Sequence, residues 1–163
     1  MNMALPVKAA AHSRADALPV RLVRTTWRRL QLTLRRDPLA AVDSAADAVQ
    51  LADQMLTATA VGRATGGIWS SVALPPLAAL IHTASPSGNG QGIRWVRAAA
   101  TSLHHEPASG TAWDHTQAHC NRPTTSMRLR TALPALRRLE PRQRDSITHV
   151  MLAAVAQPTK AHR

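Results

Sequence analysis

Apolar residues recur along most of the chain at steps of three and four, the spacing that places them on one face of an α-helix. This pattern predicts helices over about 19–34, 44–60, 76–84, 92–104, 111–120 and 127–139, and a last helix that opens at Pro141. The first of these stripes also alternates at Leu30, Leu32 and Leu34, which suits a short strand as well. The fold class predicted is all-α, an irregular bundle of six to eight short helices.

Helix boundaries are marked by capping and breaking residues. Ser44 and Asp47 have the spacing of a capping box, and Val49, Ala52 and Leu56 continue one face behind them. The prolines at 75 and 76 either begin a helix or kink one, so we expect only a short turn over 68–72 and a helix from residue 76. Residues 85–92, rich in Ser and Gly, form a loop by every local signal.

Composition supports helices and a thin core. The chain has 163 residues, 45% apolar and only 2% aromatic, with 31 alanines, four tryptophans and neither Phe nor Tyr. Alanine favours helices, while strands favour the scarce aromatic and β-branched residues, so an all-β sandwich is excluded. Leucine, valine and alanine must fill the core, and we expect the tryptophans to anchor it.

Charge is strongly positive and unevenly placed. The formal net charge is +11, and 18 of the 20 cations are arginine. The excess lies at the two ends of the chain, whereas residues 37–62 carry four aspartates and no cation. Guanidinium groups suit phosphates, so a nucleic-acid surface is one reading. Genome bias toward GC-rich codons, or a poorly selected reading frame with no function, is the other. The candidate nucleic-acid contacts are Arg21, Arg24, Arg28, Arg137, Arg138, Arg142 and Arg144.

No apolar run approaches the roughly 18 residues of a membrane span, because the longest, 72–81, holds ten residues and two prolines. The N-terminus has no apolar block of signal-peptide length, and the only cysteine is Cys120. Both features favour a cytoplasmic protein with no integral membrane span.

Catalytic chemistry has weak support in the sequence. A metal site would draw on His104, His105, Glu106, Asp114, His115, His119 and Cys120. His115 and His119 are one helical turn apart, but Thr116 stands where a helical zinc hydrolase has Glu, so solvated or capping histidines are favoured. Cys120 is interpreted as a partly buried thiol, and no glycine-rich loop precedes Lys-Ser or Lys-Thr. We therefore expect no enzyme activity and no cofactor.

Four segments, in this order, resemble a stretch of the conjugative coupling proteins, the DNA-pumping ATPases of type IV secretion. The segments are Asp37-Pro38 with the Ala-rich helix that follows, Gly67-Ile68-Trp69 leading into residues 77–82, the loop and helix start over 84–96, and Pro141 with the residues to Ile147. The resemblance covers roughly 37–156 and corresponds to the family's helical region between its two nucleotide-binding motifs. Neither ATP motif is present, so the resemblance implies a fold class without any catalytic residue.

The expected organisation is a flexible basic N-terminal arm over 1–36 with a possible amphipathic helix, a helical domain over 37–156 and a disordered tail over 157–163. The resemblance implies a non-catalytic fragment or stand-alone helical module, with DNA, bound without sequence preference, or a relaxase as partner. The alternative is a small basic DNA-binding regulator, because residues 133–156 also resemble the first half of a bacterial sigma-factor helix-turn-helix. There the chain would stop before a recognition helix.

Overall fold

A computed structural model describes residues 37–60, 67–122 and 125–156 of the chain. The predicted N-terminal arm over 1–36, with its helix or strand, and the predicted tail over 157–163 lie outside these residues. The described residues form one 3-10 helix and six α-helices and contain no strand. The all-α prediction is confirmed. None of these helices combines the length and the hydropathy that crossing a bilayer requires.

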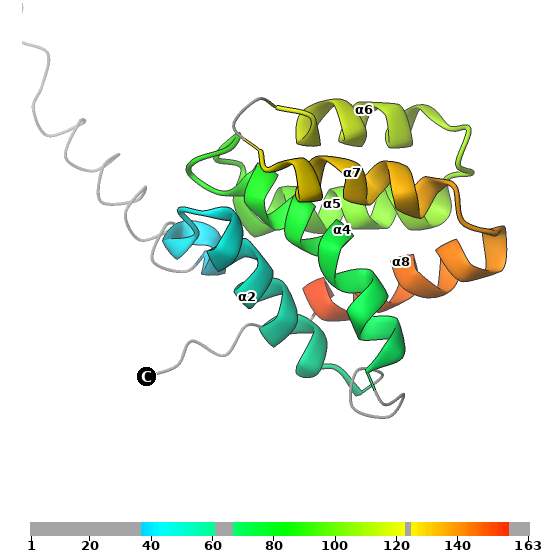
Figure 1. The fold of residues 1–163 in the computed structure, drawn as a ribbon, viewed down its shortest axis with the longest axis horizontal. Coiled ribbons are helices and arrows are strands. Elements are labelled where there is room, and N and C mark those ends of the chain that lie inside the picture. Colours follow the sequence, from blue (N-terminus) through cyan, green and yellow to red (C-terminus); the bar gives the residue numbers. More distant parts are fainter. Residues whose placement is uncertain (1–36, 61–66, 123–124, 157–163) are drawn as a thin grey trace, which may run out of the picture. The chain divides into compact units, whose positions relative to one another are not determined.

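The bundle is built around one central helix, α4 (Figure 1). Its elements are η1 (Pro38–Ala41), α2 (Ala45–Thr57), α4 (Ile68–Ala84), α5 (Gly92–His105), α6 (Thr111–Cys120), α7 (Met127–Arg137) and α8 (Pro141–Ala156). Helix α4 contacts α2, α5, α6, α7 and α8, and α5 also packs against α8. Because it is surrounded, α4 buries every residue from Pro76 to Ala84.

Helix α2 begins as predicted but presents a different face to the core. The Ser44 hydroxyl accepts from the Asp47 backbone N–H, and the Asp47 carboxylate accepts from the Ser44 N–H, so the capping box is confirmed. The buried face consists of Ala48, Ala52, Met55 and Leu56, whereas Val49 is 38% exposed. The prediction that the buried face begins at Val49 was therefore wrong, because this face begins one position earlier, at Ala48.

The prediction of a turn over 68–72 followed by a separate helix from residue 76 was wrong, because α4 runs unbroken from Ile68 through both prolines. A proline ring removes the bond to the carbonyl four residues earlier. Here those carbonyls belong to Ser71 and Val72, which are both exposed and thus open to water. Burial of the following nine residues outweighs the lost bonds.

The predicted loop over 85–92 is confirmed, and it is held by close backbone contacts. The Asn89 N–H donates to the Thr83 carbonyl at 2.7 Å, and a Cβ at Gly88 would lie 2.1 Å from that same oxygen. Farther along, Gly92 has φ +69°, and a Cβ there would lie 1.8 Å from Oδ2 of Asp37. The Asp37 carboxylate caps η1 through the Leu39 N–H and accepts from the Ile93 N–H at the start of α5.

The core is made of alanine, leucine and valine around one large ring, as the composition predicts. Trp113 on α6 is 1% exposed and is the largest fully buried side chain among the described residues. Trp69 and Trp95 pack against the core from half-buried positions, and Trp27 lies outside the described residues. Leu129, Leu133 and Leu136 of α7 are buried, as their stripe predicts, and so is the face of α8 formed by Ile147, Val150, Met151 and Ala154.

Candidate nucleic-acid interface

Four of the seven arginines predicted to bind nucleic acid meet at the corner between α7 and α8. They are Arg137, Arg138, Arg142 and Arg144, and only residues 138–140 separate the two helices. The other three, Arg21, Arg24 and Arg28, lie outside the described residues. The structure therefore brings the C-terminal group together at one place.

Arg137 is anchored to the neighbouring helix and loop. Its Nε donates to the Ala108 carbonyl at 2.6 Å, and its Nη1 lies 2.5 Å from Oδ1 of Asp114 on α6. The side chain of Arg137 is 27% exposed and that of Asp114 is 66% exposed. This guanidinium thus joins α7 to α6, and its charge is already matched by a carboxylate.

Arg144 closes the C-terminal end of α7. Its Nη1 donates to the Leu139 carbonyl at 3.3 Å and to the Arg137 carbonyl at 3.5 Å. Carbonyls at a helix C-terminus have no partner within the helix, so a cation there is favourable. The Arg144 guanidinium also lies 6.0 Å from the ring centroid of buried Trp113. Arg137 therefore links α7 to α6, and Arg144 links α8 to the C-terminal end of α7, so both side chains fix the geometry of the corner.

Arg138 and Arg142 are exposed at the same corner. Their side chains have no hydrogen bond or ion pair with any of the residues that the structure describes. They flank the turn on its two sides, Arg138 as the C-cap residue that follows α7 and Arg142 in the first turn of α8. The corner thus combines two fixed guanidinium groups with two that remain open to an anionic ligand.

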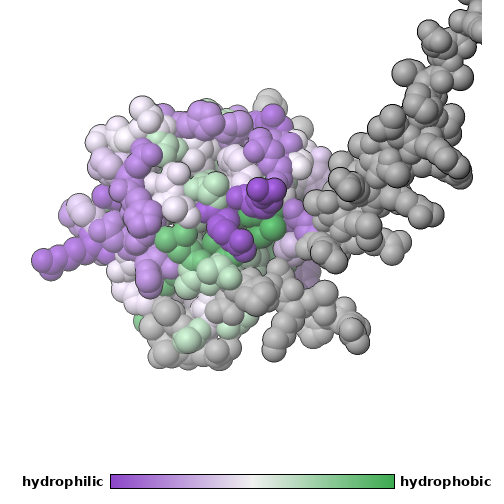
Figure 2. Space-filling view, turned by 180° about the vertical axis from the view of Figure 1, so that it is seen from behind, coloured by the Kyte–Doolittle hydropathy of each residue, from purple (hydrophilic) through white to green (hydrophobic). Residues whose placement is uncertain are grey.

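The described residues together are almost neutral. They contain nine arginines and eight carboxylates, a formal net charge of +1, so most of the chain's +11 lies elsewhere in the sequence. The sign varies along the chain: residues 37–60 carry −4 and residues 125–156 carry +4. Figure 2 shows that hydrophilic residues spread over the face opposite to that of Figure 1, around a small hydrophobic area. The positive charge of the bundle is concentrated on α7 and α8.

The residues weighed for a metal site do not converge. The His115 and His119 rings lie 4.7 Å apart between centroids, as expected for one helical turn. Asp114 forms an ion pair with Arg137, and the Glu106 carboxylate accepts a hydrogen bond from the Ala112 N–H at 3.2 Å. Across residues 37–60, 67–122 and 125–156, no three His, Cys, Asp or Glu side chains are grouped so as to hold a metal ion.

Cys120 is a buried thiol, as the sequence indicates. It is 1% exposed, and the Thr83 hydroxyl donates to its sulfur at 3.2 Å. Burial raises the pKa of the Cys120 thiol to about 11, with the hydrogen bond from Thr83 acting in the opposite direction. Because the thiolate is the nucleophile, this environment opposes nucleophilic chemistry at neutral pH.

Sequence reasoning missed two polar features. His104 on α5 approaches His149 on α8, with ring centroids 5.9 Å apart, and its Nδ1 lies 2.9 Å from the Thr148 hydroxyl. His82 on α4 is 6% exposed, and its Nδ1 has no hydrogen-bond partner among the described residues. Burial lowers the pKa of His82, so the neutral ring is favoured. No local sequence signal marks either feature, because both depend on which helices pack together.

No protein-family model, curated protein or solved structure matches the chain.

Proposed function

We propose that this chain is a non-catalytic helical module that binds nucleic acid without sequence preference, using the corner between α7 and α8. The observation that supports the proposal is that two of the four arginines there are bound by other groups of the protein and two are not. Arg137 and Arg144 are held by carbonyl oxygens, a carboxylate and a buried ring, while Arg138 and Arg142 have no partner among the described residues. The guanidinium groups of Arg138 and Arg142, which the described residues leave without partners, suit phosphate oxygens.

The resemblance to the helical region of the conjugative coupling proteins gives this proposal its context. An all-α bundle over the matched segments agrees with that region. Two of the four segments also meet in space, since Asp37 accepts a hydrogen bond from Ile93. In this proposal the module acts in the cytoplasm, on DNA or on the relaxase bound to it. It does not hydrolyse nucleotides, and saturable ATP binding by calorimetry would contradict that part.

Salt-dependent fluorescence anisotropy with labelled duplex and single-stranded DNA tests the proposal. Each neutralised phosphate contributes about −0.9 to the slope of log affinity against log salt for duplex DNA, and about −0.7 for a single strand. Six contacts by the full chain predict about a thousandfold loss of affinity between ~50 and ~200 mM salt.

The arginines are assigned with two double variants of equal charge. We expect Arg138→Gln/Arg142→Gln to reduce the duplex slope by about 1.8 in magnitude. Arg94→Gln/Arg122→Gln removes the same charge from exposed positions elsewhere and should leave the slope nearly unchanged. Circular dichroism checks that both variants stay helical. Equal slopes in the two variants would show that the corner is not the binding surface, and no binding at ~50 mM salt would refute the proposal as a whole.

A sequence-specific regulator is the second candidate. It rests on the resemblance of residues 133–156 to the first half of a sigma-factor helix-turn-helix, and Arg142 and Gln143 are exposed at the start of α8. Against it, α8 is the last helix of the described residues, so that part of the chain holds no further helix to act as a recognition helix. A footprint on one defined DNA sequence would favour this candidate over the first.

A poorly selected reading frame is distinguished by its unfolding. A chain with no selected fold would lack the cooperative urea transition that small helical domains show. We expect a single cooperative transition followed by far-UV circular dichroism.

A further inference from the structure

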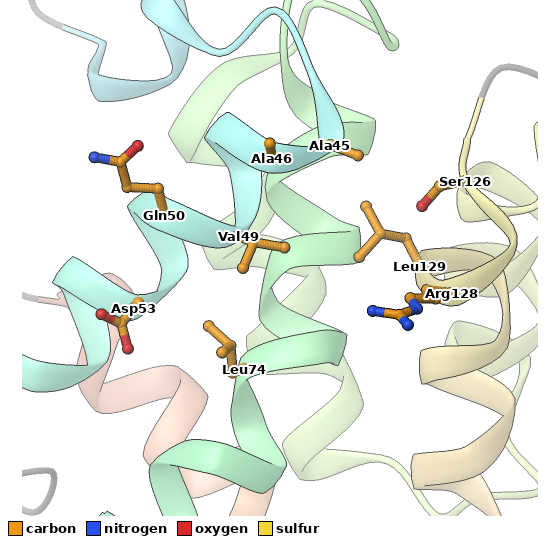
Figure 3. Close-up of a pocket in the computed structure, with 9 residues that line it drawn as sticks. All are labelled: Ala45, Ala46, Val49, Gln50, Asp53, Leu74, Ser126, Arg128 and Leu129. Carbon is orange, nitrogen blue, oxygen red and sulfur yellow. The ribbon is translucent and has the colours of Figure 1, made fainter.

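A groove of about 490 Å³ lies between α2, α4 and the start of α7 (Figure 3). The residues that line it are Ala45, Ala46, Val49, Gln50, Asp53, Leu74, Ser126, Arg128 and Leu129. Its surface is mainly apolar. Val49, on one wall, is 38% exposed and is one of the four large apolar residues that the described part of the chain exposes.

The two walls of the groove carry opposite charges. Asp53 lies on the α2 side, and Arg128 extends from the α7 side toward the hollow, with Leu74 between them (Figure 3). Among the described residues the only ion pair joins Arg137 to Asp114, so neither Asp53 nor Arg128 has an ionic partner there. Asp53 and Arg128 are the two charged residues among those that line the groove.

Because its two walls carry opposite charges, the surface of the groove is complementary to a second copy of itself. In a two-fold dimer both subunits use the same patch. Each contact between a residue of one copy and a different residue of the other therefore occurs twice. A second copy, turned by 180°, sets the acidic α2 of each subunit against the basic α7 of the other. Such an arrangement buries the exposed Val49 and supplies both unpaired charges with partners.

We propose that this groove is the contact surface of a homodimer, in which Asp53 of each copy faces Arg128 of the partner subunit. Charge complementarity selects a second copy over an unrelated helix, because each copy supplies both an acidic and a basic wall. Exposed ion pairs contribute at most about 1 kcal/mol each, so burial of the apolar surface supplies most of the affinity. The dimer is accordingly weak, and the charges set its geometry and specificity.

Sedimentation velocity of the full chain tests this proposal, over a range from about 1 to about 500 µM. The variants are Asp53→Arg and Arg128→Asp. In a homodimer of either variant, like charges meet at both contacts, so we expect its dissociation constant to rise about tenfold or more. In an equimolar mixture, one copy of each variant restores two attractive contacts. The mixture should therefore dimerise about as well as the wild type.

The mixing step separates a charge contact from simple damage to the fold, because two damaged chains would not rescue each other. Asp145→Arg and Arg94→Asp are the matched controls, since both residues are exposed and lie outside the groove. We expect each control to dimerise like the wild type, alone and mixed. A wild type that stays monomeric throughout the range overturns the proposal, and so does a mixture that dimerises no better than its components.

Discussion

The contact between Asp37 and Gly92 gives the sharpest test of how this fold is held. Replacing Gly92 by alanine adds a Cβ at a residue with φ +69° and places it 1.8 Å from a carboxylate oxygen of Asp37. The positive φ alone costs about 1–2 kcal/mol for an L side chain. Relieving the overlap must displace Asp37 from the Ile93 and Leu39 N–H groups, which costs a further ~1–3 kcal/mol.

Gly90 supplies a matched control two residues away. It has the same φ of +69°, but a Cβ there meets nothing within 4 Å. Gly90→Ala should therefore cost about 1–2 kcal/mol from backbone strain alone, and Gly92→Ala about 2–5 kcal/mol. Urea unfolding followed by far-UV circular dichroism measures both values. Equal free energies of unfolding for the two variants would refute the reasoning.

A double-mutant cycle with Asp37→Ala isolates the overlap. In that background the carboxylate is gone, so Gly92→Ala should cost no more than Gly90→Ala does. The cycle also measures the capping role of Asp37, which we expect to contribute about 1 kcal/mol. If Gly92→Ala costs the same free energy of unfolding with and without the Asp37 carboxylate, overlap with that carboxylate is not what makes alanine unfavourable at residue 92.

Three further predictions concern buried side chains. Trp113→Ala should lower the free energy of unfolding by about 3–5 kcal/mol, and Trp69→Ala, at a half-buried position, by clearly less; urea unfolding compares them. Because the pKa of the Cys120 thiol is raised to about 11 from 9.0, the unfolded chain loses that proton first as the pH rises. Stability should thus fall between about pH 9 and 11, by up to about 3 kcal/mol, and Cys120→Ala should lack this component. Burial lowers the pKa of His82 below 6.5, so the unfolded chain takes up that proton first as the pH falls. Stability present at neutral pH should be lost below about pH 6.5, and His82→Gln should lose less of it in the same range.

Local signals predicted the helices well where they act within one turn. The capping box at Ser44 and the leucine stripe of α7 depend on residues three or four apart, and both are confirmed. Those signals failed where tertiary burial decides the outcome. Pro75 and Pro76 read as a boundary, yet the helix continues because α4 is surrounded by its neighbours. Val49 read as a core residue, yet it is 38% exposed while the smaller Ala48 is buried.

The candidate interface was predictable only as a list of residues. Because they cluster in the sequence, the same role was predicted for Arg137, Arg138, Arg142 and Arg144. Their roles differ because Asp114, the Ala108 carbonyl and Trp113 come from α6 and the loop before it, far away in sequence. A pattern of charges carries no information about which guanidinium groups the fold itself uses.

The near neutrality of the bundle changes what the charge of the whole chain can explain. A formal charge of +1 over the described residues, out of +11 for the chain, leaves little long-range field from the bundle itself. In the proposed function, sequence-independent affinity for DNA would depend on the number of phosphates neutralised, so most of it would come from cations elsewhere in the sequence. Arg138 and Arg142 would account for at most about 1.8 of the duplex slope. On this proposal the corner would orient a nucleic acid on the bundle while the remaining cations would set the affinity, and variants in the two groups should separate these effects.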